Sequence, residues 1–144
     1  MSDRVLLTGI SGWIAKHTAI ELLNSGYEVL GTIRNKNLIE QTKETISKYA
    51  SIEKLSFVEL DLVKDEGWNE AAKGCKYIFH IASPFPMKVS RNRESLLPPA
   101  VDGTLRVLKA GVNAGVEQII KTSSIVAMFR KPNRSNPLSL IHIS

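Results

Sequence analysis

The sequence predicts an α/β fold in which helices cover a doubly wound parallel sheet. Three observations predict it: short β-rich apolar runs alternate with longer helical stretches, the first run ends at a glycine-rich turn, and no internal repeat interrupts the alternation. Parallel strands that are joined through helices produce this pattern. With 144 residues, the chain is long enough to bury a core as one domain or as part of one.

The elements follow one another from the first strand onward. Residues 5–8 form a compact apolar run, which is typical of a strand buried on both faces. Helical spacing then places Ile14, Thr18 and Leu22 on one face, and Gly26 ends that helix. The predicted strands are residues 5–8, 27–33, 55–60, 77–82 and 118–122, and the predicted helices are residues 13–24, 38–49, 66–73 and 99–114. The apolar face of the last helix consists of Val101, Leu105, Leu108 and Val112.

The composition excludes several classes of protein. Apolar residues make up 43% and charged residues 23%, as in ordinary globular proteins. The net charge of +5 arises in residues 61–144, but aromatic residues do not interleave with the basic ones, so we expect no nucleic-acid partner. The single cysteine, Cys75, excludes an internal disulfide and a multi-cysteine metal site, and we expect no metal.

The apolar runs are all too short to suggest a membrane protein. None approaches the ~18 residues of a membrane-spanning helix, so we expect no membrane partner. The first residues lead directly into the first strand without a signal-peptide pattern. We therefore expect a cytoplasmic protein.

A glycine-rich segment, residues 8–15, joins the first strand to the first helix. Gly9 permits a tight turn, Gly12 lets the backbone approach a pyrophosphate, and the small Ala15 allows close packing of helix and strand. Free N–H groups at the start of the helix then bind the phosphates. The alternative is a simple glycine turn, but the strand before it and the helix after it favour dinucleotide binding.

Arg34, at the end of the second strand, indicates which dinucleotide binds. An acidic residue at this position accepts a hydrogen bond from the ribose 2′-hydroxyl, whereas an arginine pairs with a 2′-phosphate. Residues 31–36 contain no Asp or Glu and two cations, which favours NADP over NAD. A solvated loop arginine is the alternative.

Three weaker signals follow the later strands. Asp61 follows the third strand, where its carboxylate could accept a hydrogen bond from the adenine amino group, or serve only as a helix N-cap or an exposed acid in a turn. His80, near the end of the fourth strand, is interpreted as a hydrogen-bonded core histidine, and the small residues after it leave room for a ribose. Residues 121–124 follow the fifth strand, where a hydroxyl group could bind a substrate carbonyl or serve only in a turn.

Together these segments resemble the extended short-chain dehydrogenase/reductase superfamily, also described as the NAD-dependent epimerase/dehydratase superfamily. The resemblance is closest to its NADPH-dependent ketone and aldehyde reductases, the group of dihydroflavonol reductase and cinnamoyl-CoA reductase. The segments that carry it are Thr8-Gly9 to Ala15, Thr32-Ile33-Arg34, Asp61-Leu62, Gly74-Cys75, His80-Ile81-Ala82-Ser83-Pro84, Val101-Asp102-Gly103-Thr104 and Thr122-Ser123-Ser124.

The resemblance implies a Rossmann-type sheet that is truncated after about the fifth strand, with NADP as cofactor and NADPH preferred over NADH. It implies that the pyrophosphate is bound by Thr8, Gly9, Ser11, Gly12, Trp13 and Ile14. It also implies that Arg34 holds the 2′-phosphate and that Asp61 and Leu62 border the adenine. The ribose and nicotinamide would be lined by Ile81, Ala82, Ser83 and Thr122, and Ser124 matches the catalytic serine of the family.

The chain also departs from the family. The family has a catalytic Tyr-x-x-x-Lys pair beyond the serine, but four residues after the three tyrosines here stand Gly31, Glu53 and Ile81. We therefore expect the chain as given to be inactive. Residues 132–144 depart from the family pattern, so we assign residues 1–131 to an incomplete NAD(P)-binding domain and residues 132–144 to a non-native tail.

These expectations lead to one functional hypothesis with alternatives. In the full-length enzyme we expect an NADPH-dependent oxidoreductase that reduces a ketone or aldehyde to an alcohol, with a small-molecule carbonyl compound as substrate. The alternatives are a sugar-nucleotide epimerase or dehydratase, a 3β-hydroxysteroid dehydrogenase-like enzyme, and a non-catalytic dinucleotide sensor of the NmrA type. The sequence predicts no particular oligomeric state.

Overall fold

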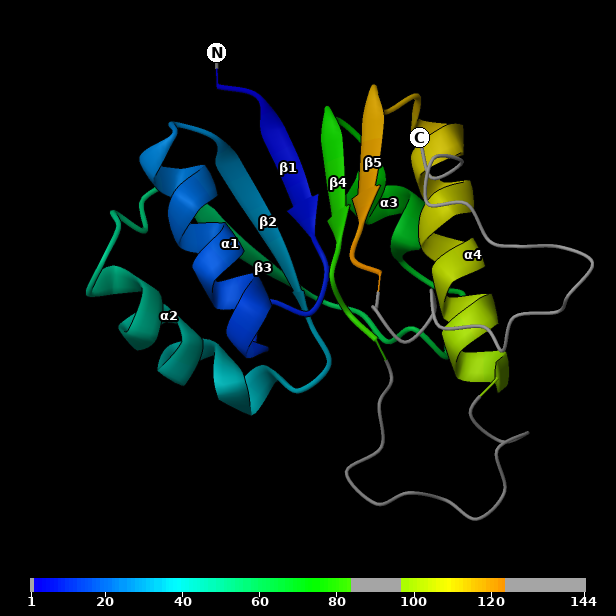
Figure 1. Cartoon of the computed structure of the whole chain (residues 1–144), viewed down its shortest axis with the longest axis horizontal. Helices are drawn as coiled ribbons and strands as arrows, with labels where there is room; N and C mark the ends of the chain where they lie inside the picture. Colours follow the sequence, from blue (N-terminus) through cyan, green and yellow to red (C-terminus); the bar gives the residue numbers. More distant parts are fainter. Residues whose placement is uncertain (1, 84–96, 124–144) are drawn as a thin grey trace, which may run out of the picture.

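A computed structural model describes residues 2–83 and 97–123 of the chain (Figure 1). Within them, five parallel strands form one sheet in the order β3-β2-β1-β4-β5. The strands are β1 (Arg4–Leu7), β2 (Glu28–Ile33), β3 (Leu55–Glu59), β4 (Tyr77–His80) and β5 (Gln118–Lys121). The α/β fold class with a parallel sheet is therefore confirmed, and the predicted strands differ from the observed ones by one or two residues at their ends.

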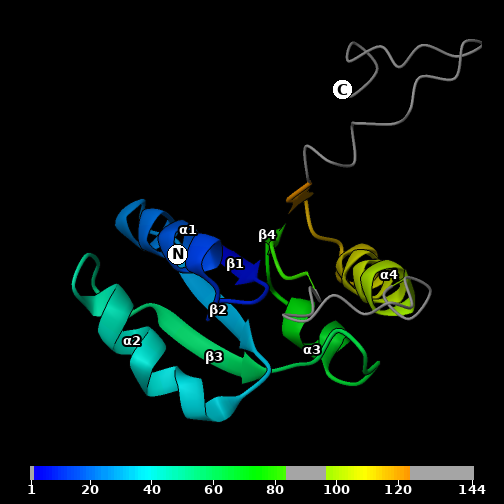
Figure 2. The ribbon, with the colours of Figure 1, turned by 60° about the horizontal axis from the view of Figure 1, so that its bottom comes forward.

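The helices lie on both faces of this sheet (Figures 1 and 2). The α-helices are α1 (Trp13–Asn24), α2 (Ile39–Ser47), α3 (Trp68–Ala72) and α4 (Leu97–Ala114), and a 3-10 turn, η1 (Lys36–Leu38), precedes α2. The strand β1 shows how the two layers divide the core. Val5 and Leu7 belong to the core under α1 and α2, whereas Leu6 belongs to the core under α3 and α4. All three side chains are fully buried, as predicted for a strand covered on both faces.

Helix α4 does not bury the face on which its large apolar residues gather. Three of the four residues of this face are exposed within the described part of the chain: Val101, Leu105 and Val112 are 51%, 43% and 76% accessible, whereas Leu108 is partly buried. The buried face instead carries small residues and Val107. A Cβ at Gly111 would lie only 2.6 Å from Cδ1 of Ile119, so the absence of side chains lets α4 pack close to the sheet.

The order of the strands places a topological switch point between β1 and β4. The chain proceeds from β1 to β2 to β3 in one direction, and then crosses to the other side of β1 to form β4 and β5. Open α/β sheets bind their ligands at the carboxyl ends of the strands next to such a switch point. The predicted glycine-rich loop follows β1, so it lies at this position.

Candidate functional site

The glycine-rich loop contacts the segment that follows β4. Gly9 has a φ of +72°, a conformation that side chains disfavour, and a Cβ at this position would lie 2.9 Å from Cβ of Ala82. Two of the predicted cofactor-binding segments are thus in direct contact. Only glycine satisfies both the backbone angle and this spacing.

Hydrogen bonds from β2 hold the first half of the loop. The N–H of Gly9 donates to Oγ1 of Thr32 at 3.0 Å, and the N–H of Ile10 donates to the Thr32 carbonyl at 3.0 Å. The N–H of Gly12 closes the turn by donating to the Gly9 carbonyl at 2.9 Å. Thr32 is therefore a loop-supporting residue, although the sequence analysis did not place it in the site.

The start of α1 presents free hydrogen-bond donors. Gly12 is the N-cap residue and offers no side chain to cap the helix. Within the described residues, the N–H groups of Trp13, Ile14 and Ala15 have no hydrogen-bond acceptor. Unpaired donors at the positive end of a helix dipole are chemically suited to an anionic group.

Thr8 connects the glycine-rich loop to β4. Its buried Oγ1 accepts hydrogen bonds from the N–H groups of Ile81 and Ala82, both at 3.0 Å. With two bonds accepted, the Thr8 hydroxyl proton is available to Nδ1 of His80, which lies 3.0 Å from Oγ1. One hydroxyl group, at the start of the glycine-rich loop, therefore forms hydrogen bonds with the end of β4 and with the segment that follows it.

This arrangement fixes the tautomer of His80. Because Nδ1 accepts from Thr8, the ring proton resides on Nε2, which donates to Oγ1 of Thr104 on α4 at 3.4 Å. The Thr104 hydroxyl donates its own hydrogen bond to the Ala100 carbonyl at 2.8 Å. Burial, with a smaller effect from the charge of Lys121, lowers the pKa of His80 to about 4. The interpretation of His80 as a hydrogen-bonded core histidine is confirmed.

Arg34 follows β2 at the same edge of the sheet. Its side chain is exposed, and within the described residues it forms no hydrogen bond or ion pair. The other cation of this segment, Lys36, pairs with Glu59 on β3 at 2.8 Å. Glu59 therefore neutralises Lys36, and Arg34 keeps its charge available for a ligand.

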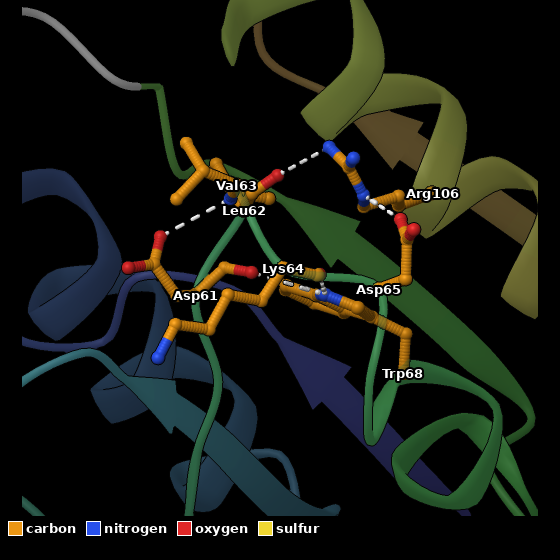
Figure 3. Close-up of polar contacts among 7 residues, drawn as sticks. All are labelled: Asp61, Leu62, Val63, Lys64, Asp65, Trp68 and Arg106. Atoms are coloured by element: carbon orange, nitrogen blue, oxygen red, sulfur yellow. Dashed lines mark hydrogen bonds and ion pairs between the residues drawn. The ribbon is translucent and has the colours of Figure 1, made fainter.

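Asp61 and Leu62 follow β3, and both side chains are partly buried. One carboxylate oxygen of Asp61, Oδ1, accepts a hydrogen bond from the N–H of Val63 at 3.1 Å (Figure 3). Asp61 thus shapes its own turn, which was the alternative interpretation of this residue. Within the described part of the chain the other oxygen, Oδ2, has no partner, so a contact with a ligand is compatible with the turn.

The remaining predicted residues lie near the ends of β4 and β5. Ile81 and Ala82 are partly buried beside Thr8, whereas Ser83 is exposed. Thr122 is placed by its N–H, which donates to the His80 carbonyl at 3.1 Å. Ser11 and Ile14 belong to the loop and the first turn of α1. Ser124, predicted as the catalytic serine, lies outside the described residues.

Among the described residues, no group of three or more His, Cys, Asp or Glu side chains is arranged to hold a metal ion. The helices of the same residues include none that is long and apolar enough to cross a membrane. The arrangement at the carboxyl ends of the strands is instead that of an anion-binding loop, a free arginine and a carboxylate-bearing turn. The sequence predicted these three groups as the residues that bind a dinucleotide.

Comparison with known proteins agrees with this geometry. A model of the NAD dependent epimerase/dehydratase family matches residues 5–140. The chain belongs to this family. The resemblance to its dihydroflavonol reductase and cinnamoyl-CoA reductase branch is also confirmed. Dihydroflavonol 4-reductase of Hordeum vulgare is 35% identical over 121 residues, which cover 83% of this chain and 34% of that protein. Cinnamoyl-CoA reductase 1 of Petunia hybrida is 36% identical over 130 residues, which cover 90% of this chain and 38% of that protein.

Solved structures show the same family relationship. The crystal structure of the yeast methylglyoxal/isovaleraldehyde reductase Gre2, complexed with NADPH, matches with a TM-score of 0.73 at 30% identity. The match covers 86% of this chain and 38% of that one. The chain thus spans 34–38% of the length of these relatives.

Proposed function

We propose that the chain is the cofactor-binding part of an NADPH-dependent oxidoreductase, and that the whole enzyme reduces a ketone or aldehyde to an alcohol. The observation that carries the proposal is the set of unpaired N–H groups of Trp13, Ile14 and Ala15 at the switch point of the sheet. The Gre2 relative was solved with NADPH, and the other two relatives are named as reductases. Cofactor and family agree with the geometry.

The residues present fit this dinucleotide from one end to the other. The N–H groups of α1 would hold the pyrophosphate, and Thr8, Gly9, Ser11 and Gly12 would form the wall of the loop around it. Arg34 would pair with the 2′-phosphate through charge-assisted hydrogen bonds. The free oxygen of Asp61 would accept from the adenine amino group, with Leu62 beside the ring.

The nicotinamide end of the cofactor would lie beyond the carboxyl ends of β4 and β5. Ile81, Ala82, Ser83 and Thr122 would line the ribose and the nicotinamide, because these segments follow the strands next to the glycine-rich loop. When bound, the cofactor supplies the hydride. Ser124 would donate a hydrogen bond to the substrate carbonyl oxygen and so orient it. We assign residues 1–131 to this domain and residues 132–144 to a segment outside it.

Calorimetric titration of the purified chain with NADPH tests this proposal. We expect saturable binding of one NADPH per chain and competition by 2′,5′-ADP, which carries the adenine and the 2′-phosphate. Free phosphate at the same concentration should compete weakly. Absence of NADPH binding to a folded chain would contradict the proposed function.

A further inference from the structure

Helix α4 contacts the turn that follows β3, far from its own position in the sequence (Figure 3). Arg106 donates from Nη1 to the Leu62 carbonyl at 2.8 Å and from Nε to the Asp65 carboxylate. One guanidinium group therefore connects two points of the turn formed by residues 61–65. Its planar shape with several donors suits this double contact, which a lysine could not reproduce.

Gly103 brings the same helix against Leu62. A Cβ at Gly103 would lie 2.9 Å from Cβ of Leu62 and 3.1 Å from its carbonyl oxygen. The helix thus touches Leu62 from one side while Arg106 holds its carbonyl. These two contacts leave little freedom for Leu62 to shift.

Trp68 supports the opposite side of the turn. Its indole Nε1–H donates to the carbonyl oxygens of Asp61 and Lys64, at 3.3 and 3.0 Å, and the side chain is only 2% exposed. The carbonyls of Asp61, Leu62 and Lys64 are therefore all bound by side chains from α3 or α4. The backbone of the turn is held independently of any ligand.

We propose that Arg106, with Gly103, is a positioning residue for recognition of the adenine ring. In this inference, α4 holds the 61–65 turn so that the free Oδ2 of Asp61 meets the adenine amino group. It rests on the proposed function, because it assumes that a dinucleotide binds at the carboxyl ends of the strands. Neither Arg106 nor Gly103 itself touches the cofactor.

A comparison of two ligands separates positioning from general stabilisation. The ligands are NADPH and its purine analogue, in which a hydrogen atom replaces the amino group of adenine. The wild-type chain should bind NADPH about tenfold more tightly, because only NADPH donates to the Asp61 carboxylate. In Arg106→Met, this ratio should fall to about one to three, since the turn loses both guanidinium contacts.

Three further variants complete the experiment. Lys109→Met removes an exposed cation from the same helix and should keep the wild-type ratio. Gly103→Ala should lower the ratio by displacing Leu62, without any change of charge. Asp65→Asn weakens one of the two Arg106 contacts at a residue whose side chain is 82% exposed, so it should fold and give an intermediate ratio.

The outcomes distinguish the inference from the function on which it rests. If the wild-type chain binds neither ligand, the proposed function fails and the inference fails with it. If the wild-type chain binds both ligands equally, or if Arg106→Met and Asp65→Asn keep the full preference for NADPH, the inference alone is overturned. A loss of affinity for both ligands by the same factor would also overturn it, because that result indicates a purely structural role.

Discussion

The hydroxyl oxygen of Thr8 lies 3.0 Å from Nδ1 of His80, although 72 residues separate the two in the sequence. This contact joins the strand before the glycine-rich loop to the strand that faces it across the switch point. The same oxygen accepts from the N–H groups of Ile81 and Ala82. The shape of the candidate site therefore depends on one buried hydroxyl group.

Replacement of Thr8 by valine should destabilise the fold strongly. Thr8→Val conserves the volume of the side chain but leaves two backbone donors and His80 Nδ1 without their buried partner. We expect a loss of about 2–3 kcal/mol in the free energy of unfolding, because unpaired buried polar groups are costly. Urea denaturation measures it.

Thr45→Val is the matched control, since the Thr45 hydroxyl only donates to the Gln41 carbonyl on the exposed surface of α2. Its effect should stay below about 0.5 kcal/mol. Equal losses in the two variants would contradict the role assigned to Thr8.

His80 should make the stability depend on pH between about 4 and 6.5. Its pKa falls from 6.5 to about 4 in the folded chain, so the unfolded chain binds more protons in this interval. The contribution of His80 is present above pH 6.5 and is lost as the pH falls towards 4, by up to about 3 kcal/mol. Lys121 is the charged group that adds to the effect of burial.

The pH dependence is measured by thermal unfolding of wild type and His80→Asn. The amide oxygen of asparagine still accepts from Thr8 but does not titrate, so the variant should lose less stability on acidification. His17→Asn, at an exposed position of α1, should behave like wild type. A His80→Asn profile parallel to that of wild type would refute the assignment.

The spacing of motifs along the chain predicted which segments form this site. It did not predict the hydrogen bonds that hold those segments in place. The first three strands are recognisable in the sequence as apolar runs, and they are followed by Gly9, Arg34 and Asp61. Because the strands are parallel, all three residues lie at the same edge of the sheet. The partnership of His80 with Thr104 depends on how α4 packs, which no local pattern reveals. Sequence spacing alone also offers no signal for the contacts of Arg106 with residues 62 and 65.

The face of α4 shows why hydrophobic periodicity alone misleads. Val101, Leu105 and Val112 have helical spacing, yet their side chains are exposed in the described part of the chain. The buried face carries Gly103, which lies close to Leu62 in the turn after β3, and Gly111, which lies close to Ile119 in the sheet. Neither glycine contributes an apolar side chain. A pattern of small residues is a weaker signal than a pattern of large apolar ones, so the sequence did not indicate which face of α4 is buried.

Gly9→Ala should weaken NADPH binding in addition to lowering the stability of the fold. Both Gly9→Ala and the control Gly26→Ala place a side chain at a positive φ, which costs about 1–2 kcal/mol in stability. Only the Cβ at residue 9 meets another group, Ala82 at 2.9 Å, whereas the space around Gly26 is open. We expect about tenfold weaker NADPH binding in Gly9→Ala alone, which corresponds to one lost hydrogen bond. Calorimetry on both variants measures it, and equal affinities would contradict the assigned contact.

The affinities of NADPH and NADH for wild type and Arg34→Ala test the central claim most directly. Wild type should prefer NADPH, and Arg34→Ala should lose about 1.5–3 kcal/mol of NADPH binding, or ten- to a hundredfold, with little change for NADH. Lys48→Ala, which removes a cation directly after α2, should keep the preference. Equal affinity of the wild-type chain for NADPH and NADH would contradict the account.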